Sequence, residues 1–153
     1  MKPGDVAHDF ELPDETGTPR RLSVLLEDGP VVLFFYPMAL SSGCTAEACH
    51  FRDLSAELDA VGARAVGISR DSVDRQREFA TKHNLGYPLL SDTDATVAGA
   101  FGVRRRLLAK VLPVKRSTFV IGTDGTVLDV ISSETNMGVH ADKALAALTA
   151  AMG

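Results

Sequence analysis

The feature that most constrains the fold is an unbroken apolar run, Val31 to Tyr36, which Pro37 ends. The run has the length of a β-strand and contains no polar interruption. A strand that exposes one face to water alternates apolar and polar residues, whereas a strand covered on both faces does not. The run therefore predicts a central strand with layers of structure on each side.

Strand and helix patterns alternate along the chain after this run. Apolar residues at three- and four-residue steps (Ala48, Phe51, Leu54 and Leu58) predict a helix over residues 45–61. We expect a second buried strand at Arg64–Ser69, and strands separated by helices pair in parallel through crossover connections. The further elements expected here are a helix capped by Ser72 or Asp74 and ending near His83, a short strand at Tyr87–Leu90, and a helix from Thr93 or Asp94 through Phe101.

Both ends of the chain carry turn signals. Residues 9–12 and 20–22 predict a hairpin around a turn at 14–19. Thr123-Asp124-Gly125 separates strands expected at residues 117–121 and 126–131, and an alanine-rich helix is expected at residues 142–152. We therefore expect one domain, residues 1–153, with an α/β fold of the thioredoxin-like type. It would have a central mixed β-sheet flanked by helices on both faces, and an N-terminal β-hairpin.

Composition argues against several classes of protein. The 153 residues carry 16 basic and 20 acidic side chains, a formal net charge of -4. A mildly acidic chain has no general attraction for nucleic acid or anionic lipid, and the basic cluster Arg104–Arg106 lacks interleaved aromatic residues. No apolar stretch approaches the ~20 residues that span a bilayer, and the N-terminus lacks the apolar region of a secretory signal. We expect a cytoplasmic protein with no nucleic-acid partner and no membrane partner.

The two cysteines, Cys44 and Cys49, are interpreted either as core thiols or as a redox pair, because structural disulfides are rare in the cytosol. Cys44 lies where the loop after the apolar strand enters a helix, and catalytic groups in open α/β sheets gather at the carboxyl ends of strands. Free N–H groups and the positive end of the helix dipole favour an anion there. We therefore expect Cys44 to be an accessible thiolate, which is the nucleophilic form of cysteine.

Nearby residues supply the rest of a nucleophilic site. Ser41 offers a hydroxyl three residues before the first cysteine, and Gly43 leaves room for a substrate to approach the sulfur. Pro37 fixes the loop where it leaves the strand. A cation is missing from this segment, and the candidate is Arg116, directly before the strand expected at residues 117–121. A guanidinium there would stabilise a thiolate and a developing negative charge together.

Cys49 cannot bond to Cys44 while the helix is intact. Residues five apart on a regular helix have Cα atoms about 8–9 Å apart and point about 140° away from each other. A disulfide needs Cα atoms within about 7 Å of each other. If the two cysteines form a redox pair, residues 45–48 must leave the helix after oxidation.

These residues resemble the active-site sequence of the peroxiredoxin family. That family has Pro, three residues, Thr or Ser, two residues and then Cys, which here are Pro37, Ser41 and Cys44. The longer string Tyr-Pro…Gly-Cys-Thr-x-Glu-Ala-Cys is similar to the PrxQ subfamily, also called bacterioferritin comigratory protein, whose second cysteine matches Cys49. Further segments that resemble the family are Phe51-Arg52-Asp53, Gly67-Ile68-Ser69, Phe101-Gly102-Val103 and Arg116–Ile121.

The resemblance implies a thioredoxin-dependent hydroperoxide reductase of the atypical 2-Cys type. Cys44 would attack hydrogen peroxide or an organic hydroperoxide and become a sulfenic acid. Cys49 would resolve it as an intramolecular disulfide, which thioredoxin or a similar dithiol protein would reduce. Pro37, Ser41 and Arg116 would complete the catalytic shell. No cofactor and no metal is implied, and an internal resolving cysteine removes the chemical need for a dimer, so we expect a monomer or a weak dimer.

The chain departs from the family at several positions and leaves alternatives open. Ser41 stands where Thr is more common, and His8 stands where the family usually has Pro. The alternative function is a peroxide or redox sensor, or a thiol-switch binding protein, that uses the same Cys44–Cys49 disulfide as a switch and oxidises once where an enzyme turns over. Glu47 is interpreted only as a partner of the helix dipole, and His140 is given no role.

Overall fold

The computed structural model describes residues 1–104, 114–133 and 136–152. Its central strand is β3 (Val31–Phe35), in which every residue is buried, as the apolar run predicts. β3 lies in the middle of a five-stranded sheet of order β5-β4-β3-β6-β7. It pairs in parallel with β4 (Arg64–Ser69) and antiparallel with β6 (Ser117–Ile121). β5 (Leu89–Ser91) and β7 (Val127–Ser132) form the edges, so the mixed sheet is confirmed.

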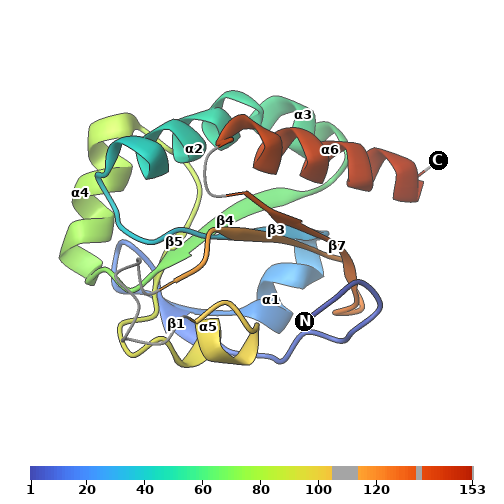
Figure 1. The fold of residues 1–153 in the computed structure, drawn as a ribbon, viewed down its shortest axis with the longest axis horizontal. Coiled ribbons are helices and arrows are strands. Elements are labelled where there is room, and N and C mark those ends of the chain that lie inside the picture. The colour runs from blue at the N-terminus through green and yellow to red at the C-terminus, as the bar shows by residue number, and fades with distance from the viewer. Residues whose placement is uncertain (105–113, 134–135, 153) are drawn as a thin grey trace.

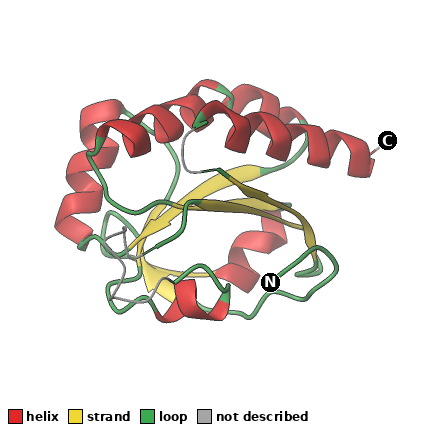
Figure 2. Ribbon diagram, in the orientation of Figure 1, coloured by secondary structure: helices red, strands yellow, loops and turns green. Residues whose placement is uncertain are grey.

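Helices cover both faces of this sheet (Figures 1 and 2). One face is covered by α2 (Ser42–Asp53), α3 (Ser55–Ala60), α4 (Val73–His83) and α6 (Gly138–Met152). The opposite face carries α1 (Leu22–Leu25) and α5 (Thr96–Ala100). Alternate residues of β3 supply the two cores, because successive side chains of a strand point to opposite faces. Val32 and Phe34 belong to the first core, and Leu33 and Phe35 to the second.

The N-terminal hairpin is confirmed, with β1 (Glu11–Pro13) pairing antiparallel with β2 (Pro19–Arg21). The prediction that Leu22 belongs to its second strand is wrong, because Leu22 begins α1. Its side chain is 2% exposed and packs with Leu25 and Leu26, so burial of these leucines favours a helical turn. A 3-10 turn, η1 (Leu26–Asp28), follows.

The turn of this hairpin is organised by a buried carboxylate, Asp14. Its Oδ1 accepts the backbone N–H groups of Thr16 at 2.8 Å and Thr18 at 3.1 Å, and its Oδ2 accepts Arg20 Nε at 2.8 Å. Burial opposes the charge on Asp14, but the hydrogen bonds outweigh it and lower the pKa of the carboxyl. The charged form therefore stabilises the hairpin.

Replacing Asp14 with Ala is expected to lower the free energy of unfolding by about 2–3 kcal/mol at neutral pH, since two backbone donors and Arg20 lose their acceptor. Because the folded pKa is lowered, this stabilisation is complete above the unfolded pKa of about 3.9 and is lost as pH falls below it. Urea unfolding at neutral pH and at about pH 3 measures both effects. A difference between the variant and wild type that does not shrink in acid would contradict this account.

Two of the predicted helices differ from those in the structure. The helix expected over residues 45–61 is divided at Leu54, whose φ of -96° and ψ of 10° leave the α region, and its first part already begins at Ser42. The last helix begins at Gly138 rather than residue 142. The Oδ1 of Asn136 accepts the N–H of Val139 at 3.3 Å, which caps the start of this helix.

Three smaller predictions are refined. The short strand begins after Pro88, at Leu89. α4 is capped by Ser72, as one of the two predicted alternatives has it. The start of α5 is expected to be capped by Thr93 or Asp94. The carboxylate of Asp92 also caps it, because it accepts the N–H groups of Val97 and Ala98 at 3.2 and 2.9 Å.

Arg105 and Arg106 of the basic cluster Arg104–Arg106 lie outside the described residues. Within the part of the chain that the structure describes, no helix combines the length and apolar character needed to cross a bilayer.

Candidate functional site

Cys44 lies in the first turn of α2, beyond the carboxyl end of β3, as predicted. Thr45 donates its N–H to the Ser41 carbonyl at 2.9 Å, so helical hydrogen bonding begins just before the cysteine. The prediction of an accessible thiol is wrong for this conformation, because Cys44 is 0% exposed and packs in the first core. The first turn of the helix is pressed against the sheet, and this buries the sulfur.

The absence of a side chain at Gly43 leaves a narrow space next to the Arg116 guanidinium, which contacts Sγ of Cys44. A Cβ built at this position would lie 3.4 Å from Nη2 of Arg116 and 3.7 Å from the sulfur of Met137. Any larger side chain would occupy that space. The missing side chain of Gly43 therefore leaves room for the Arg116 guanidinium and the Met137 side chain.

The structure brings the predicted cation to the sulfur. Arg116, 5% exposed, directs Nη2 to Sγ of Cys44 at 3.3 Å. The antiparallel register that pairs Phe35 with Ser117 explains this contact, because it places the residue before β6 at the carboxyl end of β3. Burial lowers the pKa of Arg116, but Glu47 and Cys44 outweigh it and raise the pKa above its ordinary value. The guanidinium therefore stays charged against the sulfur.

Besides Cys44, the Arg116 guanidinium contacts Glu47, which is fully buried. Its Oε1 accepts Nη1 of Arg116 at 2.8 Å. Glu47 follows Cys44 by three residues on α2, and residues three apart share one face of a helix, so one guanidinium contacts both. The interpretation of Glu47 as a partner of the helix dipole alone is therefore incomplete, and the three-residue spacing was the signal available in the sequence.

His140, which is given no role from the sequence, lies behind Glu47 in the same buried region. Its Nδ1 is 3.5 Å from Glu47 Oε2 and 2.8 Å from the Thr118 hydroxyl. Its Nε2 is 2.8 Å from the Ser133 carbonyl oxygen. Because a carbonyl only accepts, Nε2 carries the proton and Nδ1 faces Thr118. No periodicity in the sequence indicates this contact, since α6 and α2 meet only in the folded chain.

Ser41 and Pro37 lie in the loop between β3 and α2. Pro37 is buried, and the Ser41 hydroxyl donates to the Met38 carbonyl at 2.8 Å. Among the described residues, no hydrogen bond joins Ser41 to Cys44. Leu40, between Pro37 and Ser41, has a φ of 68°, in the left-handed region that costs a side-chain-bearing residue about 1–3 kcal/mol. The loop is thus held in a strained form next to the sulfur.

Two residues missed in the sequence hold this loop from outside. The N–H of Ala39 donates to Oδ2 of Asp71 at 2.7 Å, and Nη2 of Arg75 donates to the Ala39 carbonyl at 3.3 Å. Asp71 lies two residues after the end of β4, and Arg75 lies in the first turn of α4. Their hydrogen bonds hold the backbone of Ala39, two residues before Ser41.

Cys49 lies in the same helix as Cys44, is half-buried and is a free thiol, as is Cys44. Both cysteines thus occupy one continuous helix with five-residue spacing. The helical geometry keeps their Cα atoms about 8–9 Å apart, beyond disulfide reach. A bond between them requires residues 45–48 to leave the helix.

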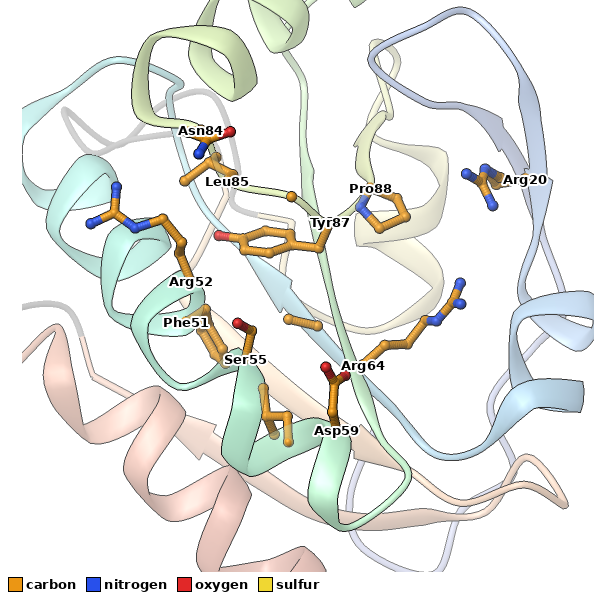
Figure 3. Close-up of a pocket in the computed structure, with 13 residues that line it drawn as sticks. Arg20, Phe51, Arg52, Ser55, Asp59, Arg64, Asn84, Leu85, Tyr87 and Pro88 are labelled. Atoms are coloured by element: carbon orange, nitrogen blue, oxygen red, sulfur yellow. The ribbon is translucent and has the colours of Figure 1, made fainter.

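A cavity of about 570 Å³ adjoins the far side of α2 (Figure 3). Phe51, Arg52 and Tyr87 line it, with Arg20 and Arg64 at its edge. Neither Cys44 nor Arg116 is among its lining residues. This cavity therefore does not contain the buried thiol.

A cysteine in the first turn of a helix, with a buried arginine on its sulfur and a mixed sheet beneath, defines a thioredoxin-like thiol enzyme. Comparison with known proteins agrees. The model of the AhpC/TSA family matches residues 3–130. A peroxiredoxin of Mycobacterium tuberculosis (strain ATCC 25618 / H37Rv) is 66% identical over 150 residues, covering 98% of this chain and 97% of that protein. Peroxiredoxin Bcp of Escherichia coli K12 is 37% identical over 130 residues, 83% of each chain.

Solved structures give the same answer. The crystal structure of Peroxidoxin BcpB from Mycobacterium tuberculosis has a TM-score of 0.93 at 66% identity and covers 98% of this chain and 97% of that one. Peroxiredoxin Q of Xanthomonas campestris has a TM-score of 0.84 at 35% identity, covering 92% and 90%. The chain belongs to the AhpC/TSA family and, within it, to the PrxQ or bacterioferritin comigratory protein peroxiredoxins. Membership supports thiol peroxidase activity, with a peroxide substrate and a thiol reductant.

Proposed function

We propose that Cys44 reduces hydroperoxides and that Cys49 resolves the product within the same chain. The observation that carries the proposal is the 3.3 Å contact between Nη2 of Arg116 and Sγ of Cys44 in the first turn of α2. A cation and a helix N-terminus together favour the thiolate. The thiolate sulfur attacks one peroxide oxygen, the O–O bond breaks, and Cys44 becomes a sulfenic acid. The other oxygen takes a proton and leaves as water or an alcohol.

The surrounding residues act on this step. Arg116 stabilises the thiolate and then the charge that develops on the leaving oxygen. Ser41 already donates its hydroxyl hydrogen to the Met38 carbonyl, so its oxygen is left as an acceptor for the O–H of a hydroperoxide. Pro37 is buried at the start of the loop and shields the thiolate from water.

Resolution requires the first turns of α2 to unwind. The thiol of Cys49 then attacks the sulfenic sulfur of Cys44, forming the disulfide and releasing water. Thioredoxin or a similar dithiol protein reduces the disulfide by exchange and is itself oxidised. Because both sulfurs belong to one chain, a monomer completes the cycle. The cycle needs a compartment that keeps such a reductant reduced, as the cytosol does.

Consumption of hydrogen peroxide coupled to thioredoxin, thioredoxin reductase and NADPH tests this function. We expect many turnovers per chain of wild type. Replacing Arg116 with Met should lower the second-order rate constant for Cys44 oxidation about 100-fold, since one preorganised charged donor is lost. A single oxidation of wild type with no turnover would contradict the proposal and support a redox switch.

Arg116→Lys is the matched control for folding. A lysine keeps the positive charge opposite buried Glu47 but cannot place two nitrogens on Glu47 and Cys44 at once. We expect an intermediate rate constant with native circular dichroism. If Arg116→Met reacts with peroxide as fast as wild type, Arg116 does not stabilise the transition state.

A further inference from the structure

Tyr87 makes a hydrogen bond to the backbone of the helix that carries both cysteines. Its hydroxyl donates to the carbonyl oxygen of Ala48 at 2.6 Å. Figure 3 shows the ring lying across the cavity wall with the hydroxyl pointing to the helix that carries Arg52. Ala48 directly precedes Cys49, so this bond reaches the segment between the two cysteines.

The ring of Tyr87 is held independently of this bond. It packs edge-on against Phe34 of β3, with ring centroids 5.8 Å apart and an interplanar angle of 73°. Burial raises the pKa of Tyr87 well above its ordinary value, so the phenol keeps its proton and remains a donor. The hydroxyl is therefore a fixed donor aimed at the helix, on a ring that would keep its packing without it.

The carbonyl of Ala48 has to move when the disulfide forms. Residues 45–48 join Cys44 to Cys49, and both sulfurs reach bonding distance only when these residues leave the helix. The Tyr87 hydrogen bond exists in the helical form and is broken in the unwound form. It therefore stabilises the form in which Arg116 contacts Cys44, relative to the form in which Cys49 reaches Cys44.

A second hydrogen bond joins α2 to the segment from His83 to Tyr87, and it is expected to behave differently on unwinding. Nη1 of Arg52 donates to the carbonyl of His83 at 2.7 Å. Arg52 follows Cys49, so this bond is compatible with unwinding of the first turns. It anchors the part of α2 that remains helical, whereas Tyr87 holds the part that must open.

We propose that Tyr87 is a positioning residue that sets the rate of resolution by holding α2 in its helical form. This inference rests on the proposed function. A slower resolution leaves the sulfenic acid exposed longer to a second peroxide, which oxidises it to a sulfinic acid and is itself reduced to water or an alcohol. The hydroxyl of Tyr87 thus sets what fraction of the Cys44 sulfenic acid becomes disulfide and what fraction becomes sulfinic acid.

Tyr87→Phe removes the hydroxyl and keeps the ring. We expect disulfide formation after peroxide addition to become about fivefold faster, the effect of losing one ordinary hydrogen bond in the helical form. The rate of sulfenic acid formation should stay unchanged, because Arg116 still contacts Cys44. The sulfinic fraction at high peroxide should fall. Rapid acid quenching, thiol alkylation and mass spectrometry measure all three species.

Thr149→Val is the matched control, since the Thr149 hydroxyl also donates to a helix carbonyl, that of Leu145 in α6, at 2.9 Å. It should leave both rates unchanged. Resolution in Tyr87→Phe that is equal to or slower than wild type, or an equal acceleration in Thr149→Val, would overturn the role of Tyr87 alone. Failure of wild type to form any Cys44–Cys49 disulfide would overturn the proposed function and this role with it.

Discussion

Replacing Cys44 with Ser is expected to reduce peroxide consumption by at least about 1,000-fold, the largest effect of any single substitution in this chain. A serine hydroxyl does not ionise near neutral pH, and its oxygen cannot be oxidised to the equivalent of a sulfenic acid. The helix N-terminus and Arg116 would still be present, but they would act on an oxygen that does not attack the O–O bond. Direct measurement of peroxide loss, with and without thioredoxin, gives the rate.

The control for this substitution is a measurement that the variant keeps the native fold. Serine is close to cysteine in size, and Arg116 can donate to a hydroxyl as it does to the sulfur, so circular dichroism and the urea midpoint should stay near those of wild type. Peroxide consumption within about tenfold of wild type by a natively folded Cys44→Ser chain would remove Cys44 from the chemistry. Cys49 would then be the nucleophile to examine.

Replacing Cys49 with Ser is expected to abolish thioredoxin-coupled turnover while leaving the first oxidation of Cys44 intact. The peroxide meets Cys44 and Arg116, whose contact at 3.3 Å involves no atom of Cys49. Without a second thiol, the sulfenic acid has no partner within the chain and accumulates, or proceeds to sulfinic acid when peroxide is in excess. A dimedone-type sulfenic acid trap followed by mass spectrometry detects the intermediate.

The wild-type chain is the control for the resolving step. After one equivalent of peroxide, it should carry a disulfide between Cys44 and Cys49 within one chain, which peptide mapping without reduction identifies. A disulfide-linked dimer in wild type, or normal coupled turnover by Cys49→Ser, would contradict intramolecular resolution. In the second case, an external thiol would be the resolving group.

Local sequence patterns were enough for the framework of the fold. The apolar run before Pro37 identified the buried central strand, because a strand covered on both faces cannot alternate polar and apolar residues. The Asp14 turn and Thr123-Asp124-Gly125 identified the two hairpins. The boundaries were less well determined. The break at Leu54 depends on backbone angles that its neighbours impose, and the helix at Leu22 depends on a core that the hairpin does not contain.

What the sequence by itself determined is the local part of the site. The position of Cys44 at a strand-to-helix junction, the loop from Pro37 to Ser41 and the spacing to Cys49 follow from neighbours along the chain. Only the tertiary structure decided the rest. Pairing of β3 with β6 delivers Arg116 to the sulfur, and packing of α6 on α2 places His140 beside Glu47. Sequence periodicity encodes which face of an element is buried, whereas contacts between distant elements depend on register and packing, which exist only once the chain has folded.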